Sequence, residues 1–155
     1  MNVLLIEDED TKKTPILFFL KTNYSFMNVK VACSVKSGID AIRTEIPDLL
    51  LLDMSLPTFD ITAIEPGGRP QGSGGLEIMR YIDMMEIQTT IIVITAYEAF
   101  TRKNGKQVDL SVLSKELNED FPDIYNGVVH FNPMLEDWTK DFDVLIQAIV
   151  KREPI

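Results

Sequence analysis

Four consecutive leucines lead into a single carboxylate in the segment Asp48-Leu49-Leu50-Leu51-Leu52-Asp53-Met54-Ser55-Leu56-Pro57. A short apolar run bounded by prolines predicts a strand that is buried on both faces, as in the middle of a parallel sheet. Asp53 then lies at the C-terminal end of this strand, where open α/β sheets bind their ligands. From this segment alone, capping of the next turn is an equally good role for Asp53.

Further apolar runs on both sides of this segment predict more strands. They cover residues 2–6, 29–32, 90–95 and 128–131. Amphipathic or capped segments between them predict helices at about 14–23, 35–46, from about 75, 110–121 and 134–151. Buried strands that alternate with helices predict an α/β fold, with one parallel sheet, helices on both of its faces and right-handed crossovers.

The size and composition of the chain narrow the classes of function that it could have. Its 155 residues are typical of one domain, and a net charge of -9 argues against a general surface for nucleic acid or anionic membrane. Cys33 is the only cysteine, so we expect no internal disulfide and no thiolate metal site. No apolar run approaches membrane-spanning length, and we expect the cytoplasm as the compartment.

The strands are expected to bring polar side chains to one edge of the sheet. These residues are Glu7, Asp8, Asp53, Thr95 and Asn132. Three carboxylates that converge imply a bound cation or one protonated carboxyl group. Carboxylate oxygens with no His or Cys beside them favour Mg²⁺ or Mn²⁺, and this chemistry suits phosphoryl transfer with an aspartate as the nucleophile.

In these motifs the chain resembles the receiver domain of two-component response regulators. The matching pieces are Leu4-Leu5-Ile6-Glu7-Asp8, Pro47 to Pro57, Gly75-Leu76-Glu77-Ile78-Met79, Ile92-Val93-Ile94-Thr95-Ala96 and Pro133 with the last helix. The resemblance covers nearly the whole chain. It implies a flavodoxin-like, doubly wound five-stranded parallel sheet with strand order 2-1-3-4-5, in a single domain over residues 1–155.

The same resemblance implies a role for each residue of the site. Asp53 would accept a phosphoryl group from a histidine kinase or a phosphotransfer protein. Asp8, Asp53 and the backbone carbonyl of Ser55 would bind Mg²⁺ directly, and Glu7 would bind it through water. Thr95 would be the switch hydroxyl that contacts the phosphoryl group.

One departure from the family pattern removes a positive charge. The family usually has Lys before the proline of the fifth strand, and this chain has Asn132. Asn donates a hydrogen bond without a charge, so stabilisation of the phosphoryl group is expected to weaken. Lys12, Lys13, Arg102 and Lys103 are possible substitutes, although we expect each of them to be an exposed surface cation.

Two further departures concern the switch and the loops. The usual aromatic residue of strand five is Val129, and the neighbouring His130 is expected to be structural. Two insertions are expected, at about 58–75 and 97–126. Gly-rich residues in the first resemble a phosphate cradle but lack the Lys and spacing of a P-loop, so a mobile flap or a contact surface for an effector protein is favoured.

These features predict a phosphoacceptor signalling domain rather than an enzyme, with at most slow autophosphatase activity. The alternative is a degenerate receiver-like interaction module that is poorly or never phosphorylated, which Asn132 keeps open. A phosphatase of the haloacid dehalogenase type would need a second Asp two residues after the nucleophile, where this chain has Ser55. We expect no direct nucleic-acid or membrane partner.

Overall fold

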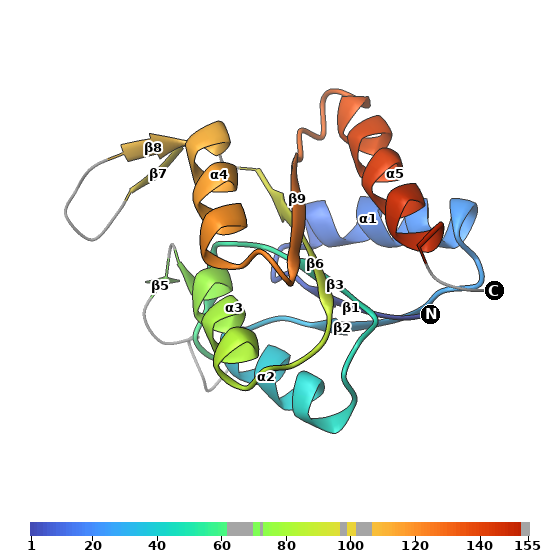
Figure 1. Ribbon diagram of the computed structural model, residues 1–155. Helices are drawn as coiled ribbons and strands as arrows, with labels where there is room; N and C mark the ends of the chain where they lie inside the picture. Colours follow the sequence, from blue (N-terminus) through green and yellow to red (C-terminus); the bar gives the residue numbers. More distant parts are fainter. Residues whose placement is uncertain (62–69, 72, 97–98, 102–106, 153–155) are drawn as a thin grey trace.

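A five-stranded parallel sheet forms the centre of the computed structural model, which describes residues 1–61, 70–71, 73–96, 99–101 and 107–152 (Figure 1). The strands lie in the order β2-β1-β3-β6-β9, which confirms the predicted order 2-1-3-4-5 among the sheet strands. Their bounds are β1 Asn2–Ile6, β2 Asn28–Ala32, β3 Leu49–Leu52, β6 Thr90–Thr95 and β9 Tyr125–His130. All neighbouring pairs are parallel.

Helices cover both faces of the sheet (Figure 1). Helices α1 (Asp10–Asn23) and α5 (Asp137–Val150) pack on one face. The other face is covered by α2 (Val35–Thr44), α3 (Gly74–Met84) and α4 (Leu110–Asp120). Successive strand residues point to opposite faces, so Leu50 and Leu52 enter one core and Leu49 and Leu51 the other. The four leucines are fully buried because each face of β3 has its own layer of helices.

The first helix begins earlier than the sequence pattern predicts. It starts at Asp10 rather than near residue 14, because the carbonyl of Glu9 accepts the N–H groups of Lys12 and Lys13 and closes the first turn. Pro15 therefore lies inside the helix. As a consequence, Lys12 belongs to the first helical turn, directly after the acidic residues that follow β1.

The last strand and helix also differ from the predicted bounds. Strand β9 starts at Tyr125, before Gly127, and α5 starts at Asp137 rather than near residue 134. The intervening chain forms a turn around Asn132. Its side-chain oxygen accepts the Met134 N–H (3.0 Å), and its main-chain carbonyl accepts the Leu135 N–H (3.2 Å). This turn uses the backbone groups that a longer helix would need.

Both segments expected to be insertions contain regular structure. The first contains β5 (Pro70–Gln71), which pairs antiparallel with β4 (Leu56–Pro57), the strand directly before this segment. In the second, β7 (Ala99–Thr101) pairs antiparallel with β8 (Gln107–Asp109). The segment 97–126 also contains all of α4, which agrees with the predicted helix at 110–121, and the first residues of β9. Most of the glycines of the suggested phosphate cradle, and Arg102 and Lys103, lie outside the described residues.

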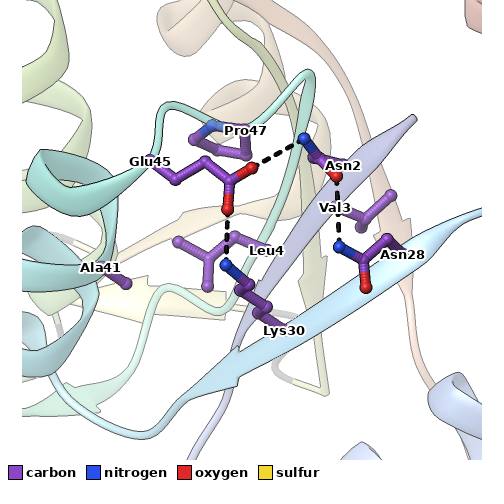
Figure 2. A pocket seen from close by; sticks show the side chains of 8 residues that line it. All are labelled: Asn2, Val3, Leu4, Asn28, Lys30, Ala41, Glu45 and Pro47. Atoms are coloured by element: carbon purple, nitrogen blue, oxygen red, sulfur yellow. Dashed lines mark hydrogen bonds and ion pairs between the residues drawn. The ribbon is translucent and has the colours of Figure 1, made fainter.

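Polar contacts tie the elements together at the N-terminal edge of the sheet (Figure 2). The Asn2 amide donates to Glu45 (2.8 Å) at the end of α2, and Asn28 donates to Asn2 (3.2 Å) across β1 and β2. Lys30 forms an ion pair with Glu45. These side chains are mostly exposed and close the edge opposite to the carboxylates that follow β1 and β3. In the described ranges, no helix has the length and apolarity to cross a membrane.

Candidate functional site

The carboxylates of the candidate site follow two strands that lie side by side. Ile6 and Leu52, the last residues of β1 and β3, are paired, and the Asp53 N–H donates to the Ile6 carbonyl (3.1 Å). Glu7 and Asp53 are only 1% and 3% exposed. Ligand oxygens of Glu7, Asp8 and Asp53 lie within 4.8 Å of one another. The structure therefore brings together the three acidic residues that the sequence predicts, and we call them the carboxylate cluster.

A buried lysine completes this cluster, and the sequence analysis placed it on the surface. The Lys12 ammonium is 2.8 Å from Glu7 Oε2 and 3.0 Å from Asp53 Oδ1, and the residue is 2% exposed. The expectation of an exposed cation was wrong for Lys12, because α1 starts at Asp10. The buried residues of α1 are Lys12, Ile16 and Leu20, and their spacing of four residues was the available signal.

Burial controls the charges of the cluster. Loss of water raises the pKa of Asp53 to about 6, although the Lys12 ammonium and the Ser55 N–H favour its charged form. Burial and the nearby charge of Asp53 raise the pKa of Glu7 to about 8. Burial also opposes the charge on Lys12, but the two carboxylates outweigh this effect and raise the Lys12 pKa. When all three carboxyl groups are ionised, the cluster holds more negative charge than its single ammonium balances.

Two buried oxygens of the cluster, Asp53 Oδ1 and Asp8 Oδ1, accept no hydrogen bond from the described residues, and only Asp53 Oδ1 has an ion-pair partner, Lys12. Asp8 Oδ1 is buried and accepts no hydrogen bond from the part of the chain that the structure describes. A buried carboxylate oxygen without a donor is costly unless a cation binds it. The hard oxygen donors and the missing positive charge fit a small divalent cation such as Mg²⁺.

Three further residues were predicted to belong to the site: Thr95, Ser55 and Asn132. Thr95 is fully buried at the end of β6, the strand next to β3. Ser55 is half-buried, and its N–H stabilises the charged form of Asp53. The side-chain oxygen of Asn132 instead accepts the Met134 N–H, and within the described residues Asn132 makes no hydrogen bond to Asp53. The structure thus places Ser55 beside Asp53 and Thr95 at the end of the neighbouring strand, and it gives Asn132 a role in its own turn.

The last two residues of β9, Val129 and His130, make contacts within the fold. Val129 is fully buried in the core, at the position where the family usually has an aromatic residue. His130 follows it, and its Nε2 atom lies 3.3 Å from the carbonyl oxygen of Ala96. This contact joins the ends of β6 and β9, where the two strands are paired.

A glycine lets α3 begin directly against the strand end that carries Asp53. The Gly75 N–H donates to the Met54 carbonyl (3.0 Å). A Cβ atom at Gly75 would lie 2.3 Å from the Asp53 carbonyl oxygen and 2.8 Å from Met54 Cα. Because both neighbours are backbone atoms, only glycine permits this approach. Gly75 therefore fixes the position of α3 relative to the site.

The chain after β4 is anchored to the start of α2 by contacts that the sequence did not reveal. Asp60 Oδ1 accepts hydrogen bonds from the hydroxyls of Ser34 (2.6 Å) and Ser37 (2.7 Å). The Lys36 N–H donates to the Thr58 carbonyl (3.0 Å). Ser34 is the predicted N-cap of α2 and is fully buried. These contacts fix the first residues of the predicted insertion at 58–75.

Comparison with known proteins identifies the family. The family model of the response regulator receiver domain matches residues 3–121. The chain therefore belongs to the response regulator receiver family, whose members act in two-component signal transduction.

Individual relatives agree with this assignment. The chain is 26% identical over 145 residues to the Detocs response regulatory protein DtcB of Enterobacter cloacae, with 91% of this chain and 95% of the relative covered. It is 24% identical over 140 residues to the uncharacterized protein y4jR of Sinorhizobium fredii, with 89% and 91% covered.

Solved structures of response regulators share the fold at lower sequence identity. The Mn²⁺-bound form of the response regulator Rcp1 has a TM-score of 0.66 at 15% identity, with 99% of this chain and 97% of that chain covered. The receiver domain of a LuxO repressor protein from Vibrio parahaemolyticus has a TM-score of 0.63 at 17% identity, with 96% and 92% covered.

Proposed function

We propose that Asp53 accepts a phosphoryl group from the phosphohistidine of a histidine kinase or phosphotransfer protein. The observation that carries this proposal is the buried Asp53 carboxylate, held within 4.8 Å of Glu7 and Asp8 at the end of a central strand. Membership of the receiver family supports it. In the transfer, an Asp53 oxygen forms a bond to phosphorus while the bond from phosphorus to the donor nitrogen breaks, and its electron pair stays on nitrogen.

A divalent cation belongs to this proposal. Asp8, Asp53 and the Ser55 carbonyl would hold Mg²⁺, and Glu7 would contact it through water. When bound, Mg²⁺ offsets negative charge on the carboxylates and the phosphoryl oxygens. The unpartnered Asp8 Oδ1 supports this assignment. The structurally similar response regulator Rcp1 is described in a Mn²⁺-bound form, which also supports a divalent cation.

The protein's own residues position the reacting groups. Burial of Asp53 keeps bulk water away from the acyl phosphate, which favours slow hydrolysis over rapid turnover. We expect the Thr95 hydroxyl to donate to a phosphoryl oxygen, and the half-buried Ser55 to influence the rate of hydrolysis. The protein then acts as a phosphoacceptor signal rather than as an enzyme. Its output would pass to an effector protein through the predicted insertions.

Incubation with a small phosphodonor and Mg²⁺ tests this function. Intact-mass spectrometry should show one added phosphoryl group on the wild type and none on Asp53→Asn. Asp48→Asn is the matched control, because Asp48 flanks the opposite end of the same strand and is exposed. This control should be labelled like the wild type. An unlabelled wild type at saturating donor and Mg²⁺ would refute the proposal.

The alternative function is a receiver-like interaction module that is not phosphorylated. Asn132 favours it, because its side chain brings no charge and is used in the turn before α5. In this case the wild type stays unlabelled, and effector binding is unaffected by Asp53→Asn. Binding that depends on phosphodonor would exclude the alternative.

A further inference from the structure

Lys12 is almost completely buried, unlike most lysines, and it contacts Asp53, the proposed phosphoacceptor. Its ammonium bridges Glu7 Oε2 (2.8 Å) and Asp53 Oδ1 (3.0 Å), and its side chain is 3% exposed. Among the residues that the structure describes, Lys12 carries the only ammonium paired with Asp53. Lys13, the next residue, pairs instead with the exposed Asp10 at 3.2 Å.

We propose that Lys12 is the phosphoryl-binding cation of this receiver domain and that helix α1 supplies the charge that Asn132 cannot. The inference rests on the proposed phosphorylation of Asp53. It assigns a phosphate-contacting role to a residue in the first turn of α1, the helix that follows β1. In the sheet, β1 and β9 lie on opposite sides of β3. Family membership alone does not predict this location, because the family's lysine belongs to strand five.

The charge balance of the phosphorylated site supports the assignment. Asp8 with a phosphoryl group of nearly two negative charges exceeds the charge of one divalent cation, and the excess is larger when Glu7 is ionised. The Lys12 ammonium reduces this excess. A charged donor bound to a phosphoryl oxygen forms a hydrogen bond about twice as strong as a neutral one. Asn132 brings no charge: its amide N–H can donate only a neutral hydrogen bond, and its side-chain oxygen accepts the Met134 N–H.

The proposed step requires only a local movement of the lysine. Before transfer, the ammonium forms an ion pair with Asp53 Oδ1. As an Asp53 oxygen bonds to phosphorus and the bond from phosphorus to the donor nitrogen breaks, the Asp53 carboxylate loses its charge and the phosphoryl oxygens retain theirs. The ammonium then leaves Asp53, donates a hydrogen bond to a phosphoryl oxygen and keeps its ion pair with Glu7. No proton leaves Lys12 in this step.

Beryllofluoride binding, measured by calorimetry in the presence of Mg²⁺, tests this role on the full chain. Lys12→Met should bind about tenfold to a hundredfold more weakly than the wild type, since it loses a charged hydrogen bond. Lys13→Met is the matched control and should bind like the wild type. In the Lys12→Met background, Asn132→Lys should restore part of the affinity, because it returns the cation to strand five. A purely structural lysine would not be rescued in this way.

The amine signal of Lys12 provides a second readout that needs no folded Lys12→Met protein. In ¹⁵N spectra of the wild type, its ammonium resonance should shift when beryllofluoride is added, while that of Lys13 should not. Wild-type binding with an unchanged Lys12 resonance, or equal affinity of folded Lys12→Met and the wild type, would overturn the assignment and leave the proposed function standing. A wild type that binds no beryllofluoride and accepts no phosphoryl group would overturn both.

Discussion

Removal of the Asp53 charge is expected to stabilise the metal-free protein. In the folded state, burial raises the pKa of Asp53 from 3.8 to about 6, so ionisation of this carboxyl group favours unfolding. Asparagine has a similar shape and keeps an oxygen that can accept from Lys12, but it never ionises. We therefore expect Asp53→Asn to unfold at higher denaturant concentration than the wild type at neutral pH.

The size and pH window of the effect follow from the same pKa difference. The folded protein holds the Asp53 proton more tightly than the unfolded chain, so the unfolding free energy falls as the pH rises from 3.8 to about 6 and stays low above that. At about 1.4 kcal/mol for each pH unit, the difference is worth about 3 kcal/mol. Asp53 is 3% exposed, so solvent screening reduces this value little.

Urea unfolding with a chelator present measures the effect. The free energies of the wild type and Asp53→Asn should be similar near pH 4 and differ by about 3 kcal/mol near pH 8. Saturating Mg²⁺ should reduce the difference in unfolding free energy between the two proteins, because the cation offsets the negative charge of Asp53 in the wild type. Asp48→Asn, at an exposed carboxylate, controls for a general loss of negative charge. A difference that does not change with pH, or a less stable Asp53→Asn at pH 8, would refute this account of the cluster.

Three further changes test the surrounding structure. Gly75→Ala places a Cβ 2.3 Å from the Asp53 carbonyl, so we expect a loss of about 2–3 kcal/mol in urea unfolding, whereas Gly38→Ala meets the movable end of a side chain and should cost less. Mg²⁺ should raise the melting temperature of the wild type, with about 2.7 kcal/mol of stabilisation at a hundredfold excess over Kd, and Asp8→Asn should remove most of this shift in a thermal scan. Asp109→Ala removes the N-cap of α4 and should lower the unfolding free energy by about 1 kcal/mol in chemical denaturation, with phosphodonor labelling unchanged.

The strands of the sheet could be predicted because they have strong local signals, and the resemblance to the receiver family supplied their order. The Leu49–Leu52 run is apolar at every position, which is expected only for a strand covered on both faces. Asp53 at its end, and the acidic residues after Ile6, then had to converge once the two strands were neighbours. This part of the site depends on strand order alone, so one sequence is enough to predict it.

Lys12 could not be placed in the same way, because its position depends on where α1 begins. Pro15 suggested a helix that starts near residue 14, since proline is favoured in the first turn. The actual start at Asp10 is fixed by main-chain hydrogen bonds to Glu9, for which the sequence has no side-chain cap signal. Likewise, Asp60 reaches Ser34 and Ser37 over a long separation in the chain, and no local pattern encodes such a contact.

The location of Lys12 also determines which element senses a ligand on Asp53. Only residues 7–9 separate the end of β1 from the start of α1, so Lys12 is tied closely to the acidic residues that precede it. Asn132, in contrast, is followed by a turn before α5 begins at Asp137, and its side chain is part of that turn. If Asp53 is phosphorylated as proposed, we therefore expect the phosphoryl group to act first on α1 through Lys12 and only indirectly on the end of β9. In this chain, α1 is therefore expected to respond to phosphorylation of Asp53 in addition to the insertions that we propose as the effector surface.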